Sequence, residues 1–465
     1  MVFSSTTFLF LFLPAVWGLY TFVPRRLLKL KNFILAAASL VFYAFGEPVY
    51  VAVMLFSAVL NYALAIAVSR AKRKKALLSA AVIADILILF TFKYVPWLVS
   101  VVNSAAGIAI PVPAELKLPI GISFYTFQIL SYVIDVYREK CPAQRNFLDL
   151  LLYISFFPQL IAGPIVKYGD IADQIRDRTV SVEKTAVGIR RFIIGLSKKV
   201  LISNSAAIMA DAAFAASAPS SLFAWLGAVC YGIQLYYDFS GYSDMAIGLA
   251  GMFGFSLNEN FNYPYAATSI RDFWKRWHIS LTSWFREYVY IPLGGNRRGK
   301  ARTVFNRIVI FFLTGIWHGA NFTYILWGMW HGLLMLFEEL VGFHRLEAKR
   351  ALRPLTRLWT LLAVCIGFVM FRASGVVEGF RYLGAMFSFS GASHAFDFLT
   401  PWALLMIVVG VVFSAPLLRY LKTLSEKHFP VLGEAFSYVI CASLLVLSVM
   451  SLTSSAFNPF IYYIF

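Results

Sequence analysis

Three of the six histidines fall between residues 278 and 331, and two of them share a sequence context. His318 lies in Thr314–Asn321 and His331 in Trp327–Gly332, and both are flanked by Trp and Gly. Glycine permits close approach of another backbone around the polar ring. Because a neutral imidazole is the natural general base near pH 7, this cluster predicts removal of a proton from a hydroxyl. Taken alone, His278 is more simply interpreted as a histidine that caps or packs a helix end.

Metal chemistry is not predicted. The spacing of these histidines matches no ligand pattern, and carboxylates that could complete a site are scarce. The four cysteines are far apart and include no Cys-x-x-Cys pair. The sequence therefore predicts neither a zinc site nor a disulfide framework.

A second cluster, Gln234–Asp244, places carboxylates in an apolar segment. Asp238, Ser240 and Asp244 are too polar to face lipid, and ionisable residues inside a membrane are functional candidates by default. Two interpretations remain open: the cluster lines an internal cavity, or it forms a structural hydrogen-bond network between helices. Gly241 predicts a bend in this segment.

A third cluster covers residues 269–307, where nine Lys or Arg residues are interspersed with tryptophans. This combination predicts a helix that lies in the cytoplasmic membrane interface. Arg271 and Arg276 are candidate ligands for an anionic substrate. The general excess of Lys and Arg in cytoplasmic loops nevertheless explains most of these charges.

Membrane helices must position these clusters. Of the 465 residues, 60% are hydrophobic and 14% are charged, whereas soluble chains are about 45–50% apolar and 25% charged. The runs Leu28–Gly46 and Val49–Val68 are almost entirely apolar, unlike the alternating strands of a membrane β-barrel. The sequence predicts an all-α polytopic membrane protein with about ten to twelve membrane segments, some re-entrant or broken. The net charge of +18 is attributed to cytoplasmic loops and membrane lipid, with no nucleic-acid partner.

The basic loops predict the orientation. Residues 24–32, 70–75 and 137–146 are rich in Lys and Arg, so they are predicted to be cytoplasmic and the N-terminus to lie outside. The first apolar run lacks a basic leader and a cleavage site and is interpreted as a retained helix. Residues 148–166 lie between basic segments and contain two prolines and a glycine. We expect a re-entrant segment there, with a Pro-kinked spanning helix as the alternative.

The second half of the chain predicts a membrane hairpin followed by further helices. Residues 304–318 and 322–340 form the hairpin, which returns to a cytoplasmic loop at 343–357. The aromatic tail, 458–465, is expected outside, where it either docks a partner or anchors in the headgroup region. Since no internal repeat occurs, one membrane domain is predicted over 1–465, divided into N-terminal helices (1–146), a central core (147–342) and C-terminal helices (343–465).

Several motifs together resemble a known family, the membrane-bound O-acyltransferases (MBOAT). The resemblance extends over the whole chain and is strongest to the bacterial polysaccharide branch, typified by an alginate-acetylating membrane subunit. The segments that carry it are Phe156–Ile165, Tyr237–Asp244, Phe273–Ser280, Trp284–Asn296 and Gly315–Gly319.

The resemblance implies a helical fold around two opposed funnels, one cytoplasmic and one extracytoplasmic. It implies that His318 matches the essential histidine of the family and His278 the second signature position. Residues expected to line the funnels or bind substrate are Asp238, Ser240, Asp244, Trp317, Asn321, His331, Arg271 and Arg276.

The implied activity is transfer of an acetyl group from cytosolic acetyl-CoA across the bacterial inner membrane for O-acetylation of an exported polysaccharide. No bound cofactor is expected. An extracytoplasmic SGNH-like partner with a Ser-His-Asp site would finish the transfer, because the neutral outer stretch 373–400 has no such pattern. The alternatives are D-alanyl transfer to a cell-wall polymer and a transporter without chemistry. Protein S-palmitoylation is excluded because no DHHC-type cysteine cluster exists.

Overall fold

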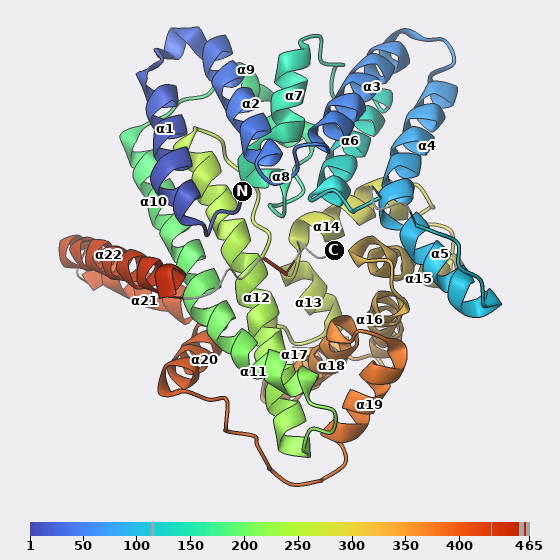
Figure 1. Cartoon of the computed structure of the whole chain (residues 1–465), viewed down its shortest axis with the longest axis vertical. Helices are drawn as coiled ribbons and strands as arrows, with labels where there is room; N and C mark the ends of the chain where they lie inside the picture. The colour runs from blue at the N-terminus through green and yellow to red at the C-terminus, as the bar shows by residue number, and fades with distance from the viewer. Residues whose placement is uncertain (113–115, 429, 455–459, 462–465) are drawn as a thin grey trace. The chain divides into compact units, whose positions relative to one another are not determined.

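All regular elements in the described part of the chain are helices. The structure is a computed structural model that describes residues 1–112, 116–428, 430–454, 460 and 461. Figure 1 shows the order of the helices along the chain. The predicted all-α class is therefore confirmed.

The contacts group the chain into two compact units, which are described separately. The first comprises Met1–Phe192 and Ser243–Asn258, and the second comprises Ile193–Tyr242 and Glu259–Ile461, with the remaining assigned residues outside the described part. Two helices, α10 (Val182–Ser197) and α12 (Ser221–Met252), run from one unit into the other.

Among the described residues of the first unit, nine α-helices lie wholly within it. They are α1 (Leu13–Phe22), α2 (Leu28–Ala44), α3 (Val51–Arg70), α4 (Lys74–Lys93), α5 (Val95–Ala106), α6 (Ile122–Tyr137), α7 (Phe147–Ser155), α8 (Phe157–Leu160) and α9 (Tyr168–Arg176).

Six described helical segments are long and apolar enough to cross a membrane. They are Arg25–Ala44, Val51–Arg70, Lys74–Lys93, Val182–Ala215, Arg350–Arg372 and Val431–Ser454. Their length and composition make this a multi-pass membrane protein. The expected total of ten to twelve membrane segments is not confirmed. Three further apolar helices in the described residues, Phe8–Phe22, Val95–Ala106 and Pro401–Phe413, are shorter than a full crossing.

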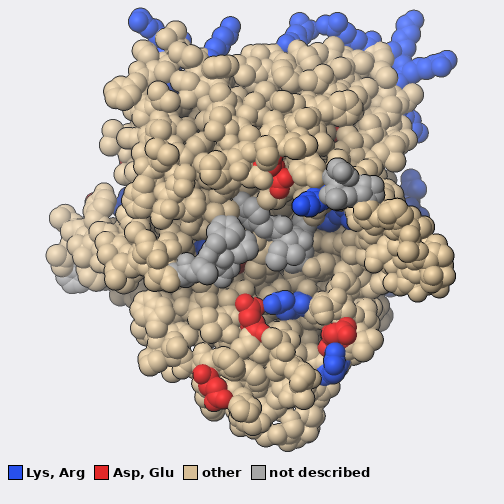
Figure 2. Space-filling view, viewed as in Figure 1, with Lys and Arg blue, Asp and Glu red and all other residues tan. Residues whose placement is uncertain are grey.

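Two of the predicted cytoplasmic loops meet at the same end of the first unit. Lys74, at the start of α4, donates to Glu139 after α6 at 2.7 Å, and this contact lowers the pKa of the Glu139 carboxyl. Figure 2 shows Lys and Arg side chains projecting from this end, where Figure 1 places the α3–α4 and α6–α7 connections. The basic loops at 70–75 and 137–146 therefore share one side of the unit.

The segment predicted to be re-entrant enters and returns at one end. Helix α7 breaks at Phe156, and the short α8 and a turn lead into α9. The side-chain amide of Asn32, near the start of α2, donates both to Asp149 at the start of α7 and to the carbonyl of Ile175 at the end of α9, each at 3.0 Å. A continuous kinked helix across 148–166 is therefore wrong, and the reversal has the geometry expected of a re-entrant segment.

The second unit contains the remaining helices. They are α11 (Asn204–Ala215), α13 (Ile270–Arg276), α14 (Ile279–Phe285), α15 (Lys300–His318), α16 (Phe322–Leu340), α17 (His344–Ala348), α18 (Arg353–Arg372), α19 (Val376–Met386), α20 (Pro401–Phe413), α21 (Leu417–His428) and α22 (Pro430–Ser454).

The bend predicted at Gly241 is wrong, because α12 is continuous through this position. A Cβ there would lie 2.7 Å from the carbonyl oxygen of Gly195 and 3.1 Å from the amide of Lys199. The glycine is needed because another helix passes closely.

The single interfacial helix predicted within 269–307 is also wrong. His278 adopts a left-handed conformation with φ 46° and separates α13 from α14. Trp274, Trp277 and Trp284 are buried. They form part of the protein interior rather than an interfacial belt.

The aromatic tail lies mostly outside the described residues. Of its members, Phe460 is buried and packs against Phe239 and Tyr242, with ring centroids 6.2 and 4.8 Å away. The amide of Ile461 donates to Asp238 at 2.8 Å. At Phe460, the expectation of an exposed docking or anchoring surface is therefore wrong.

Candidate active site

The α15–α16 hairpin positions two of the three candidate histidines. A Cβ at Gly315 would lie 2.5 Å from the carbonyl oxygen of Tyr324, and one at Gly328 would collide with the carbonyl of Phe311. Glycine therefore lets the two helices pack with their backbones in contact. This packing brings His318, at the end of α15, onto the indole of Trp327 in α16, with centroids 4.9 Å apart.

Two tryptophans each contact two of the three histidines. Trp317 contacts His278 at 5.7 Å and His318 at 4.9 Å between ring centroids. Trp327 contacts both His318 and His331, the latter at 5.3 Å. All three histidines are at most 1% exposed. The structure thus brings the three predicted histidines into one aromatic enclosure.

His278 is held by a residue that the sequence reasoning missed. Its Nδ1 lies 3.3 Å from the side-chain oxygen of Asn260, a fully buried residue. Phe239 closes another side of the ring, edge-on at 4.7 Å. The only sequence signal is the Asn-rich stretch 258–262, where nothing distinguishes Asn260 from its neighbours.

Burial keeps His278 neutral. Removal from water lowers the pKa of His278 to about 3, because the charged imidazolium is disfavoured there. A neutral imidazole retains one nitrogen lone pair and can accept a proton from a substrate hydroxyl.

His331 packs against Trp327. Its ring is parallel to Phe273 at 6.0 Å and perpendicular to Trp274 at 5.5 Å. Among the described residues, neither ring nitrogen has a hydrogen-bond partner. Gly367 of α18 makes room for it, because a Cβ there would lie 3.1 Å from Nε2.

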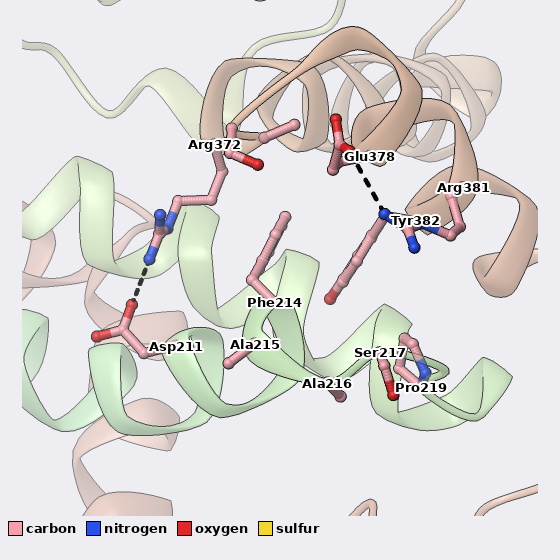
Figure 3. Close-up of a pocket in the computed structure, with 12 residues that line it drawn as sticks. Asp211, Phe214, Ala215, Ala216, Ser217, Pro219, Arg372, Glu378, Arg381 and Tyr382 are labelled. Atoms are coloured by element: carbon pink, nitrogen blue, oxygen red, sulfur yellow. Dashed lines mark hydrogen bonds and ion pairs between the residues drawn. The ribbon is translucent and has the colours of Figure 1, made fainter.

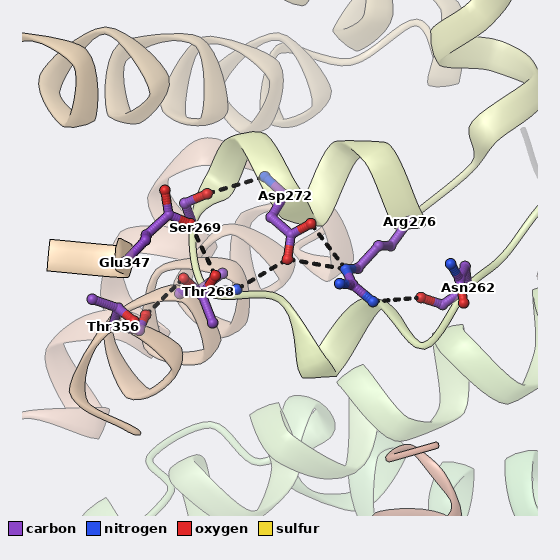
Figure 4. Close-up of polar contacts among 8 residues, drawn as sticks. Asn262, Thr268, Ser269, Asp272, Arg276, Glu347 and Thr356 are labelled. Atoms are coloured by element: carbon purple, nitrogen blue, oxygen red, sulfur yellow. Dashed lines mark hydrogen bonds and ion pairs between the residues drawn. The ribbon is translucent and has the colours of Figure 1, made fainter. Parts of the chain in front are cut away.

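Polar contacts fix α13, the short helix that leads to His278 (Figure 4). The Ser269 hydroxyl caps the helix by accepting from the amide of Asp272 at 3.1 Å. Arg276 donates to Asp272 at 3.0 Å and to the carbonyl of Asn262 at 3.3 Å. Arg276 therefore has a structural role in this turn, whereas Arg271 is exposed.

A buried carboxylate supports the same helix from α16. Glu338 accepts from the amide of Ile270 at 2.9 Å and from the indole of Trp359 at 3.2 Å. This contact satisfies a backbone N–H that the first turn of α13 leaves without a helical partner.

Two of the polar candidates in α12 form ion pairs. Asp238 is paired with Lys199 and accepts from Ser203 at 3.5 Å. Asp244, in the first unit, pairs with Arg191 at 2.8 Å. These contacts favour the structural interpretation of the two carboxylates. Ser240 is buried, and its hydroxyl has no hydrogen-bond partner among the described residues.

Asn321 and Trp317 have distinct positions beside His318. The Asn321 side chain caps α16 by accepting from Thr323 at 3.1 Å, and it donates to the carbonyl of Ser374 at 3.0 Å. Trp317 contacts two histidines, as described above. Asn321 is therefore a capping residue that also ties the hairpin to the end of α18.

A pocket of about 370 Å³ opens at the end of α18 (Figure 3). Arg372 pairs there with Asp211 at 2.8 Å, and Phe214 stacks on Tyr382 at 4.1 Å. The preceding residue, Phe371, packs on His318 at 5.2 Å. Arg372 of the pocket and Phe371 beside His318 are therefore consecutive residues.

A smaller apolar pocket of about 150 Å³ is lined by residues of α13, α14, α15 and α16. Trp274 and Phe311 form part of its wall, and Arg286 and Arg307 contribute positive charge. Trp274 also contacts His331. Within the described residues, no cluster of three or more His, Cys, Asp or Glu is arranged to hold a metal ion.

Comparison with known proteins identifies the class. The model of the membrane-bound O-acyltransferase family, MBOAT, matches residues 141–380, which include all three histidines. The chain belongs to this family and is an acyltransferase.

Two relatives are similar over most of the chain. "Probable alginate O-acetylase AlgI" of Pseudomonas aeruginosa is 45% identical over 396 residues, covering 84% of this chain and 75% of the relative. "Peptidoglycan O-acetyltransferase" of Helicobacter pylori is 34% identical, covering 90% and 86%. A more distant relative, "Teichoic acid D-alanyltransferase" of Bacillus subtilis, is 32% identical over 63% of this chain and 76% of its own.

Proposed function

We propose that this membrane O-acyltransferase passes acetyl groups from cytosolic acetyl-CoA across the bacterial inner membrane for O-acetylation of an exported polysaccharide. The observation that carries the proposal is the placement of Trp317 between two buried histidines, His278 and His318. Relatives named for O-acetylation of alginate and of peptidoglycan support the acyl group and the acceptor class.

His318 is assigned the role of general base. Its imidazole accepts the proton of the acceptor hydroxyl while the oxygen attacks the thioester carbonyl, the C–S bond breaks, and the thiolate leaves and takes up a proton. A relay through an acyl-histidine is the alternative, in which the imidazole nitrogen itself attacks the thioester and the C–S bond breaks, so that the thiolate leaves and takes up a proton. The acceptor hydroxyl then attacks the acetyl-imidazole, which releases the neutral histidine. Mass spectrometry of the enzyme quenched during turnover separates the two, because only the relay leaves an acetyl group on His318.

The donor is assigned to the apolar pocket beside α13. Its aromatic wall suits the uncharged arm of the donor, and Arg286 and Arg307 suit its phosphates. Arg307 also pairs with Glu339, so phosphate binding at Arg307 would exchange one anion for another.

The acceptor polymer is too large for a buried enclosure, so a partner outside the membrane completes the transfer. The described outer stretch 373–400 contains His394 hydrogen-bonded to Asp397 at 2.7 Å, both exposed. Ser374 lies elsewhere, at the pocket of Arg372. A separate protein with a Ser-His-Asp site is therefore proposed as the acceptor of the acetyl group.

Reconstitution tests the proposal. The chain is inserted into liposomes with its cytoplasmic face outward, and labelled acetyl-CoA is added outside. The lumen contains the partner and the polymer together, one of them, or neither. Acetylated polymer is expected only when both are present and His318 is intact. Polymer acetylation by the purified chain alone, or a normal rate from His318→Ala, contradicts it.

D-alanyl transfer is the second candidate, because of the similarity to the teichoic acid enzyme. The same liposomes supplied with a D-alanyl thioester distinguish the two. Faster transfer of D-alanine than of acetate would favour the alternative.

A further inference from the structure

Asn260 is attached to the turn of His278 by both its backbone and its side chain. The side-chain oxygen Oδ1 accepts from the amide of Ser280 at 3.2 Å and from its hydroxyl at 2.9 Å. The backbone carbonyl of Asn260 accepts from the amide of Ile279 at 3.0 Å. These bonds flank His278, whose left-handed backbone is uncommon for a residue other than glycine.

The contact with Ser280 settles which amide atom faces His278. A backbone N–H can only donate, so the atom 3.2 Å from the Ser280 amide must be the oxygen of Asn260 and not its nitrogen. This oxygen is also 3.3 Å from Nδ1 of His278. Because a carbonyl oxygen only accepts, Nδ1 must carry the hydrogen of this bond. In the neutral ring, the lone pair is then on Nε2.

We propose that Asn260 is a positioning residue that holds His278 as its Nδ1–H tautomer, so that Nε2 is the nitrogen that exchanges protons during acyl transfer. The bond made by one ring nitrogen generally decides which nitrogen of a histidine is protonated. The inference rests on the proposed acyl transfer and adds to it the tautomer and the residue that selects it.

Aromatic rings cover two further sides of the imidazole. Phe239 and Trp317 present aromatic faces and edges to His278, at 4.7 and 5.7 Å. Aromatic rings stabilise the position of the imidazole but distinguish poorly between its two neutral forms. The amide oxygen of Asn260, in contrast, makes a directional contact with Nδ1.

Three substitutions test the role. Asn260→Ala removes the acceptor but keeps the backbone bond to Ile279. Asn260→Asp keeps an oxygen acceptor at the same position. Ser280→Ala is the matched control, because it removes another donor from the same oxygen without touching the imidazole.

Two measurements are made on each variant: acetyl transfer in the liposomes that contain partner and polymer, and NMR of the purified protein. The kcat and KM of acetyl transfer report the reaction, and ¹⁵N NMR of histidine-labelled protein reports the tautomer, with the His278 signals identified by their loss in His278→Ala. Asn260→Ala is expected to lower kcat by about 10–100-fold with little change in KM, as for other residues that orient a functional histidine. Its spectrum should lose the preference for Nδ1–H, whereas Asn260→Asp should keep Nδ1 protonated and Ser280→Ala should resemble the unmodified protein.

The NMR measurement needs no substrate, so it separates this inference from the proposed function. If the unmodified protein does not transfer acetyl groups, the proposed function fails while the spectra still test Asn260. If Asn260→Ala retains the Nδ1–H tautomer, or retains full kcat, the assignment of Asn260 is wrong. Loss of activity only in proportion to loss of folded protein, with the tautomer unchanged, also overturns it.

Discussion

Gly315 of α15 lies against the backbone of Tyr324 in α16, so close that a Cβ on the glycine would be 2.5 Å from the Tyr324 carbonyl oxygen. We expect Gly315→Ala to push the helices apart and to destabilise the protein by about 1–3 kcal/mol, the usual effect of overpacking. Because His318 lies one turn further along α15, acyl transfer should fall as well. Thermal unfolding in detergent and an activity assay measure the two effects.

Gly384→Ala provides the matched control, since this helical glycine has open space where the methyl group would be. Alanine there should leave the melting temperature unchanged or raise it slightly, because alanine favours helix. Equal melting temperatures for the two variants would contradict the close packing of α15 and α16.

Removal of the His318 imidazole should abolish acyl transfer without unfolding the protein. A general base typically contributes about 10²–10⁴-fold to a rate, so His318→Ala should reduce kcat by that factor. Its melting temperature and its insertion into membranes distinguish loss of chemistry from loss of structure. A folded variant with near-normal turnover would exclude His318 as the base.

The buried pair of Lys199 and Asp238 predicts an asymmetric effect of mutation. Their side chains are 5% and 1% exposed, so Lys199→Met leaves a carboxylate without its cation and should cost about 3–5 kcal/mol. Replacing both residues with apolar ones of similar size should restore part of this loss. For comparison, Arg25→Ala breaks the exposed pair with Asp177 and should cost no more than about 1 kcal/mol.

The orientation in the membrane predicts which loops react from the cytoplasm. Single cysteines placed in 70–75 and 137–146 of a chain without its native cysteines should both be labelled only from the cytoplasmic side, since Lys74 and Glu139 join the two loops. The loop at 343–357 should behave in the same way. If an impermeant external reagent labels 70–75, the predicted topology is wrong.

Local features of the fold could be read from the sequence. The apolar runs beginning at Leu28 and Val49 correspond to α2 and α3, because twenty apolar residues in lipid must satisfy their own backbone groups as a helix. Pro158 and Gly163 correctly indicated a broken segment after α7. The apolar residues from Ala76 onward are divided between α4 and α5 at Tyr94, just before Pro96.

The contacts between helices could not be predicted from the sequence. Gly241 predicted a bend, and only the position of Gly195 shows that the glycine instead admits a close neighbour. His278, His318 and His331 were each identified by type, but their common enclosure depends on two tryptophans that belong to different helices. Asn260 could not be identified, because its importance arises from a contact 18 residues along the chain.

The bond between the amide of Ile461 and Asp238 spans 223 residues. A growing polypeptide cannot make this contact until residue 461 has been synthesised, long after Lys199 and Asp238. During that interval the carboxylate of Asp238 lacks one of its donors, and the ring of Phe460 is missing from its place beside Tyr242. This part of the second unit therefore cannot reach its final packing before residue 461 has been synthesised, and an insertion machinery or chaperone that retains the nascent helices has that interval in which to act.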